Sequence, residues 1–183
     1  MFVDPRRWGA LIGVAGGLVF IFSYAPQLGT VVRVGAGVVG IGLTLAILFD
    51  HYVRPTSLGA FQEPRPAAVV VYVCCVAGEL TVIALGSRLL PGAGHGDLRP
   101  ALIAGVVGLH FLPFAWAFGE RMFYSLGLAL LVLGGLGLIV GYGGITHAAD
   151  AAAVLSGLVM LVLLALHAQG RFAHQPRSDV PAA

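Results

Sequence analysis

Long apolar runs alternate with short polar stretches along the whole chain. Each run is long enough for a helix with a rise of ~1.5 Å per residue to cross a hydrocarbon layer of ~30 Å. This pattern predicts an all-α fold, an integral membrane bundle of six transmembrane helices that forms one domain over residues 1–168. The predicted spans cover residues 8–25, 31–49, 67–90, 100–118, 122–140 and 148–168.

The polar stretches between the runs contain residues that end helices. Pro64 and Pro66 make residues 62–66 the clearest linker, because proline cannot continue a helix. Residues 119–121 form so short a connection that the fourth and fifth spans must be antiparallel neighbours. Residues 169–183 contain prolines and polar residues, so we expect a disordered cytoplasmic tail there.

Composition supports the membrane assignment and excludes one class of partner. Hydrophobic residues make up 58% of the chain, charged residues make up 10%, and the mean hydropathy is +0.96, which is outside the range of soluble domains. The net charge is only +2 and no basic stripe is present, which argues against a nucleic-acid partner. All ten basic residues are arginine, which suggests a GC-rich bacterial genome and hence the bacterial cytoplasmic (inner) membrane.

Arginine is unevenly divided between the two sides of the predicted bundle. With an even number of spans, both termini and the second and fourth loops share one side, which has seven arginines against three on the other. The positive-inside rule then places the N-terminus and the C-terminus in the cytoplasm. The seven are Arg6, Arg7, Arg54, Arg65, Arg121, Arg171 and Arg177, and the three are Arg33, Arg88 and Arg99.

Glycine occurs 27 times and lies mostly within the spans. Small residues four apart, such as Gly137 and Gly141, allow neighbouring backbones to approach closely. The glycine density over residues 134–144 weakens a helix, so we expect the outer end of the fifth span to be irregular. Residues 10–20 also resemble residues 101–111 at an offset of 91, which suggests an inverted repeat of three spans, the architecture of many secondary transporters.

Two ionisable residues lie at membrane depth, Glu79 in the third span and His110 in the fourth. Each is about halfway along its span, so the two can meet at one depth. A lone carboxylate there would cost at least ~2.5 to 3.5 kcal/mol, so we expect Glu79 to be protonated or paired, and His110 is the natural partner. The pair is either a proton relay, the polar centre of a substrate cavity, or a hydrogen-bonded clamp between two helices.

Pro113 follows His110 by three residues in the fourth span. It cannot donate a backbone hydrogen bond to the carbonyl of Leu109, so the sequence predicts a kink beside His110. The kink is either static or a hinge.

Two pairs of polar residues are secondary candidates. Asp50 and His51 close the second span on the cytoplasmic side, where they either line a pore mouth or are solvated interfacial residues. His147 and Asp150 lie three apart on one helix face at the outer start of the sixth span. That spacing suits a metal, but two ligands do not make a site, and an acidic residue near a helix N-terminus is explained by the helix dipole.

No cofactor is predicted, although haem or metal binding stays open as an alternative. His167 near the inner end of the sixth span, together with His51 or His110, could supply axial haem ligands, but no haem-attachment motif is present. Cys74 and Cys75 are adjacent inside an apolar span, which is typical of buried small hydrophobic residues and not of a disulfide or a metal pair.

The segment from Gly108 to Trp116 has the pattern Gly-x-His-x-Leu-Pro-x-x-Trp, with His110 and Pro113 at its centre. It resembles a motif of a family of small bacterial multi-spanning membrane proteins that has no assigned activity. The resemblance covers the fourth span and the start of the fifth. It implies a polytopic membrane fold in which His110, Pro113 and Trp116 form one functional or structural unit.

These observations leave three function classes open. The leading one is a small transporter, channel or proton-linked membrane component that has Glu79 and His110 as its polar centre. The second is a membrane-embedded redox or hydrolytic enzyme, although the hydrolase motif Gly-x-Ser-x-Gly is absent from the sequence. The third is a structural or accessory subunit. The expected partners are the lipid bilayer, a second copy or another membrane protein, and a small solute or proton.

Overall fold

The computed structural model describes residues 5–58 and 63–173. Within these ranges the chain forms helices and turns and contains no strand. Gln62 of the predicted linker and residues 174–183 of the predicted tail lie outside the described residues. The long helices are α1 (Pro5–Tyr24), α2 (Thr30–Leu48), α3 (Ala68–Gly92), α4 (Arg99–Phe118), α5 (Arg121–Tyr142) and α6 (Ala148–Ala168), with shorter turns at η1 (Ala25–Leu28), η2 (Phe49–Val53) and η3 (Gly96–Leu98).

All six predicted spans are confirmed as helices. Each is long and apolar enough to cross a membrane. The structure extends the second span through η2, a π-helical turn, and carries α3 through Pro91. Residues 169–173, which fall in the predicted tail, form hydrogen-bonded turns, in which the backbone N–H of Gly170 donates to the carbonyl of His167.

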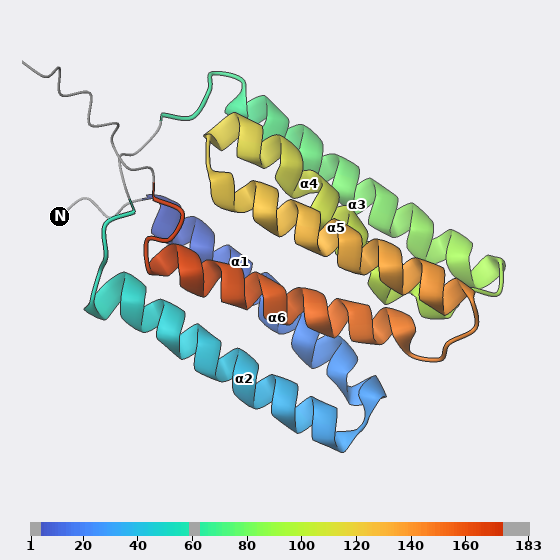
Figure 1. Cartoon of the computed structure of the whole chain (residues 1–183). Coiled ribbons are helices and arrows are strands. Elements are labelled where there is room, and N and C mark those ends of the chain that lie inside the picture. The colour runs from blue at the N-terminus through green and yellow to red at the C-terminus, as the bar shows by residue number, and fades with distance from the viewer. Residues whose placement is uncertain (1–4, 59–62, 174–183) are drawn as a thin grey trace, which may run out of the picture.

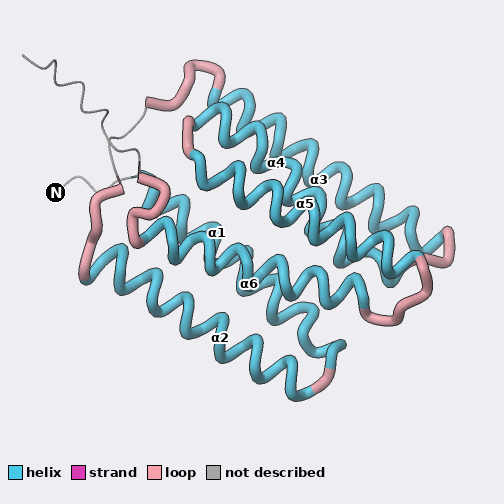
Figure 2. The backbone as a smooth tube through the Cα atoms, in the orientation of Figure 1, coloured by secondary structure: helices cyan, strands magenta, loops and turns pink. Residues whose placement is uncertain are grey.

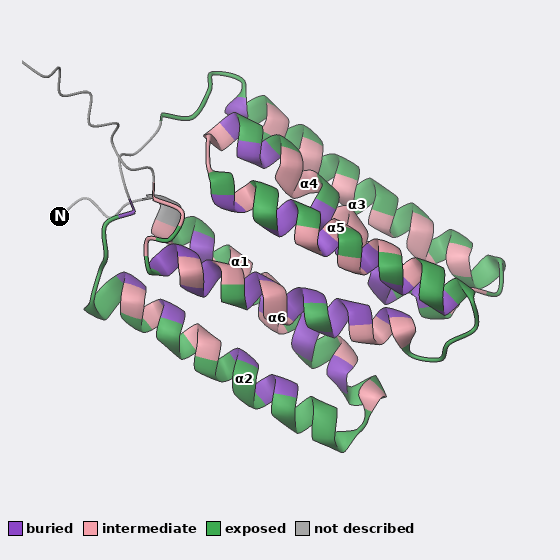
Figure 3. Ribbon diagram, in the orientation of Figure 1, coloured by how far each residue is buried: buried purple, intermediate pink, exposed green. Residues whose placement is uncertain are grey.

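The helices lie side by side in two groups of three (Figure 1). One group contains α1, α2 and α6, the other contains α3, α4 and α5, and α6 packs against α4 and α5 to join them. Burial follows this arrangement (Figure 3). In the most apolar 18-residue window of each helix, 61% of the residues are buried in α6, the largest share, and only 6% in α3, the smallest. Helix α3 packs mainly against α4 and is therefore a peripheral helix.

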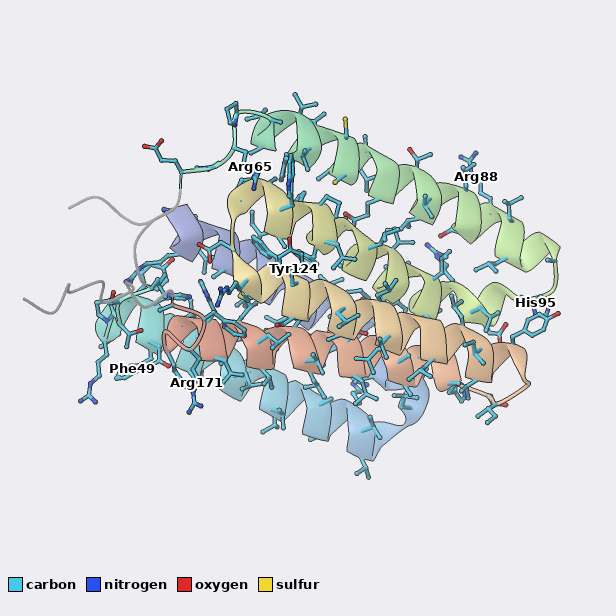
Figure 4. All side chains as sticks on the ribbon, turned by 45° about the horizontal axis from the view of Figure 1, so that its top comes forward. Phe49, Arg65, Arg88, His95, Tyr124 and Arg171 are labelled. Carbon is cyan, nitrogen blue, oxygen red and sulfur yellow. The ribbon has the colours of Figure 1, made fainter. Side chains whose placement is uncertain are left out.

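The loops gather at the two ends of the bundle (Figure 2). Arg65 and Arg171 lie at one end, and Arg88 and His95 lie toward the other (Figure 4). This division agrees with the loops that the sequence assigns to each side. Which end faces the cytoplasm stays a prediction from the arginine distribution.

The glycine-rich end of α5 is regular, and the expected irregularity there was wrong. The helix continues to Tyr142, and Gly134, Gly137 and Gly141 face neighbouring helices. A Cβ atom on Gly137 would stand 2.9 Å from the Cβ of Ala101 in α4, and one on Gly141 would stand 2.6 Å from Leu98. Close packing thus offsets the low helix propensity of glycine.

The grouping of the helices bears on the suggested repeat. Each group combines the first two helices of one half of the chain with the third helix of the other half. An inverted repeat whose halves exchange their third helices would produce this arrangement. The two groups still differ, because α6 packs against α2 whereas α3 packs mainly against α4 alone.

Candidate functional site

The structure brings Glu79 of α3 and His110 of α4 together about halfway along the two helices. The Nδ1 atom of His110 lies 2.9 Å from Oε2 of Glu79, and the two side chains are 13% and 17% exposed, respectively. The ring N–H is not aimed closely enough at the carboxylate to make a well-aligned hydrogen bond. The two groups are largely shielded from solvent and lie within ion-pair distance of each other.

Aromatic rings surround the imidazole of His110. The ring centroids of Phe111 and Phe114 lie 4.2 Å and 4.9 Å from that of His110. Phe114 stacks on Tyr72 of α3 at 5.5 Å, and Phe111 stacks on Phe123 of α5 at 5.7 Å. The polar pair thus lies against a continuous aromatic cluster, which we define as Tyr72, Phe111, Phe114 and Phe123.

A cavity of about 680 Å³ runs along this pair, and we call it the central cavity. Its walls come from α1, α3, α4, the start of α5 and α6, and they are mostly apolar. Both Glu79 and His110 line it, as does the whole aromatic cluster. A volume of this size is within the ~300 to 1,000 Å³ that is usual for small-molecule sites.

The central cavity reaches the side of the bundle between α1 and α3. Ile12 and Val19 of α1 and Tyr72 of α3 line the cavity and are themselves 73%, 63% and 46% exposed. These two helices lie in different groups of the bundle and are not packed closely against each other. If the six helices span a membrane as the sequence predicts, this opening faces the lipid.

We name the ends of the bundle after the predicted orientation, so that the end with Arg65 and Arg171 is the inner end and the opposite end is the outer end. Polar residues line the inner end of the central cavity. Glu120, which precedes α5, and His167 of α6 line it there, together with Pro64. The loop that carries Pro64 is held on α4, because the guanidinium of Arg65 lies 4.6 Å from the ring centroid of Trp116 and the backbone N–H of Arg65 donates to the carbonyl of Ala117.

A second cavity of about 470 Å³, the outer cleft, lies at the other end of the bundle. Asp97, Arg99, His147 and Asp150 line it, so it is far more polar than the central cavity. Tyr24 at the end of α1 lines both cavities. The side chain of Tyr24 therefore stands where the two cavities approach each other.

The motif residues around His110 have different surroundings. Pro113 is exposed on the surface of α4, and α4 continues as a helix through it. Trp116 is 46% exposed and holds the Arg65 loop. His110 alone of these three residues lines the central cavity.

The structure does not bring Asp50 and His51 into the central cavity. His51 is only 1% exposed, so the interpretation of it as a solvated interfacial residue was wrong. The π-helical turn directs it inward, where its ring lies 6.4 Å from that of His167 and its carbonyl accepts a hydrogen bond from Arg7. His51 thus helps to join the inner ends of α1, α2 and α6.

His147 and Asp150 are in contact at the start of α6. Nδ1 of His147 lies 3.1 Å from Oδ2 of Asp150, and the pair lines the outer cleft. His147 has a positive φ of 62°, a left-handed conformation that is unfavourable for a side chain with a Cβ atom. Among the described residues, no group of three or more ligating side chains gathers that could hold a metal ion.

Comparison of the chain with protein-family models, with curated proteins and with solved structures finds no match in any of the three. The site therefore rests on its own geometry. The sequence indicated Glu79 and His110 but missed Tyr24, Glu120 and the aromatic cluster. Aromatic residues occur throughout the apolar spans, so only the spacing of four residues between His110 and Phe114 hints that the two share a helix face.

Proposed function

We propose that this polytopic membrane protein is a small proton-linked transporter of the bacterial cytoplasmic membrane, with Glu79 and His110 as its proton-binding centre. The observation that carries the proposal is the 2.9 Å contact between the two side chains on the wall of the central cavity. An ionisable pair at membrane depth that also faces a cavity is the usual form of a proton-coupling site. A clamp between helices would need no cavity beside it.

Charge considerations favour a proton as the coupled ion. The carboxyl group and the imidazole together are neutral when they share one proton, whether it lies on the nitrogen or on the oxygen. Loss of that proton leaves a net negative charge among apolar side chains, which is unfavourable in a site of low dielectric constant. Binding and release of the proton therefore depend on what else the cavity holds.

Two further features support a transporter over a static subunit. The central cavity and the outer cleft approach each other at Tyr24, so access from the two sides of the membrane can be controlled at one place. The exchange of third helices between the two halves is also compatible with the inverted repeats of secondary transporters.

Proton flux into liposomes tests the proposal. Protein reconstituted into vesicles that contain a pH-sensitive dye is given an imposed pH gradient and membrane potential, and candidate solutes are added. We expect Glu79→Gln and His110→Gln to abolish solute-dependent proton movement. Thr81→Val is the matched control, because Thr81 lies on the same helix, is exposed, and does not line the cavity. Unchanged flux in both variants, with both correctly folded, would rule out the pair as the proton site.

A further inference from the structure

The walls of the central cavity indicate what kind of molecule it accepts. The aromatic cluster of Tyr72, Phe111, Phe114 and Phe123 lines the cavity around His110 and Glu79. The faces of aromatic rings attract cations, and the attraction increases when the cation is removed from water. A carboxylate that shares an apolar cavity with several such rings is the recognition chemistry for a positively charged group with apolar substituents.

The net charge of the Glu79–His110 pair also favours a cationic substrate. When the proton shared by Glu79 and His110 leaves, the pair carries one net negative charge. A monovalent cation in the cavity would neutralise that charge, and so would the returning proton. The site therefore favours either one proton or one cation and disfavours both together. A neutral or anionic occupant gains nothing from this exchange.

We infer that the substrate class of the central cavity is a monovalent, hydrophobic organic cation, which binds as the proton leaves the Glu79–His110 pair. In each exchange one cation enters from the lipid-facing opening or the inner end, and one proton is released to water. This inference rests on the proposed transport function and specifies its substrate. A small hydrated metal cation is a poor alternative, because the walls are mostly apolar and the polar pair brings only one carboxylate, too few oxygen ligands to replace the water shell of the ion.

Other titratable groups also face the cavity. They are Tyr24 of α1, Tyr72 of α3, Glu120 before α5 and His167 of α6, and Cys75 lies one turn before Glu79 on α3. Among the residues that the structure describes, Glu120 is the one other carboxyl group that lines the cavity, and it lies at the inner end. A variant at Glu120 therefore has to be compared with one at Glu79.

Binding of tetraphenylphosphonium to the purified full-length protein in an uncharged detergent tests the inference. Tetraphenylborate, which has the same shape and the opposite charge, is the matched control ligand. We expect the phosphonium to bind with an affinity that rises about tenfold per pH unit while the pair is protonated, with release of about one proton per cation bound. We expect the borate to bind at least about tenfold more weakly, a difference of ~1.4 kcal/mol.

The variants locate the site. Glu79→Gln should remove the pH dependence and the proton release, and Glu79→Asp should keep both. Asp50→Asn, at a carboxyl group that lines neither cavity, should leave both unchanged. Loss of the proton release in folded Glu120→Gln but not in Glu79→Gln would assign the proton to Glu120 and overturn the inference. Equal binding of both probes, or binding and proton release that persist in folded Glu79→Gln, would overturn the inference. If the phosphonium fails to bind but the liposome flux still depends on Glu79, the substrate class is wrong and the transport function stands. If binding behaves as expected but no variant alters flux, the transport function is wrong.

Discussion

Gly134 of α5 and Gly105 of α4 pack backbone against backbone. A Cβ atom on Gly134 would stand 2.6 Å from the Cα of Gly105 and 2.8 Å from the carbonyl oxygen of Ala101, which no real Cβ atom tolerates. The same seam continues at Gly108, whose added Cβ would stand 2.8 Å from the carbonyl oxygen of Gly127. Helices α4 and α5 are therefore fixed against each other, and α4 is the helix that holds His110.

Gly134→Ala should destabilise the protein by about 1 to 3 kcal/mol, because the methyl group forces the two backbones apart. A Cβ atom on the adjacent Gly135 would have no neighbouring atom within 4 Å, so Gly135→Ala is a control that should be neutral or stabilising by up to about 1 kcal/mol. Thermal unfolding in detergent measures both. Equal stability of the two variants would contradict the close approach of α4 and α5.

Glu79 and His110 should be energetically coupled. A double-mutant cycle of Glu79→Ala and His110→Ala should give a coupling energy of about 0.6 to 2 kcal/mol, the range for polar contacts between membrane helices. Reversible unfolding in mixed micelles supplies the four free energies. Strict additivity would mean that the 2.9 Å contact does not stabilise the fold.

Tyr24 should restrict movement between the central cavity and the outer cleft, because it lines both. Tyr24→Ala removes the ring and should raise passive proton leak through reconstituted protein several-fold, while Tyr24→Phe should not. Vesicles loaded with a pH-sensitive dye measure the leak. If both variants behave like the unaltered protein, another side chain separates the cavities.

At position 147, glycine should give a more stable protein than alanine, which is the reverse of the usual order within helices. Both substitutions remove the contact with Asp150, but alanine keeps the Cβ atom that makes a φ of 62° unfavourable. His147→Ala should therefore be less stable than His147→Gly by about 1 to 2 kcal/mol. Thermal unfolding of the two variants decides this, and a more stable alanine variant would argue against the left-handed conformation.

The orientation of the bundle can be checked with single cysteines in a chain that lacks Cys74 and Cys75. Glu63→Cys lies in the loop assigned to the cytoplasm and Thr146→Cys in a loop assigned to the outside, and both positions are exposed. A membrane-impermeant maleimide added to intact cells should label residue 146 and spare residue 63. The opposite pattern would invert the topology.

Hydropathy was enough to predict the number and approximate bounds of the helices, because a bilayer requires long apolar segments. The meeting of Glu79 and His110 followed from depth alone, since each is near the middle of its span. The sequence did not predict which helices pack against one another. The spans are apolar on all sides, so no polar face marks which side of a helix points inward, and the central place of α6 has no clear signal in the sequence.

Two predictions that were based on local residue types were wrong. Glycine at residues 134–144 suggested a weak helix, but its effect on α5 is offset by packing against α4 and α6. His51 lies beside Asp50 at the end of a span, where solvent exposure was a natural expectation. A single π-helical turn changes the direction of its side chain, and such a turn cannot be recognised from residue types alone.

The peripheral position of α3 has a consequence for biogenesis. The other five helices contact one another without it, whereas α3 is joined to the bundle mainly along α4. In a two-stage assembly, in which helices insert first and associate afterwards, α3 can be the last helix to dock. The polar pair would then be completed at the end of assembly. A copy in which α3 has not docked would lack the contact between Glu79 and His110, so formation of this contact reports that assembly is complete.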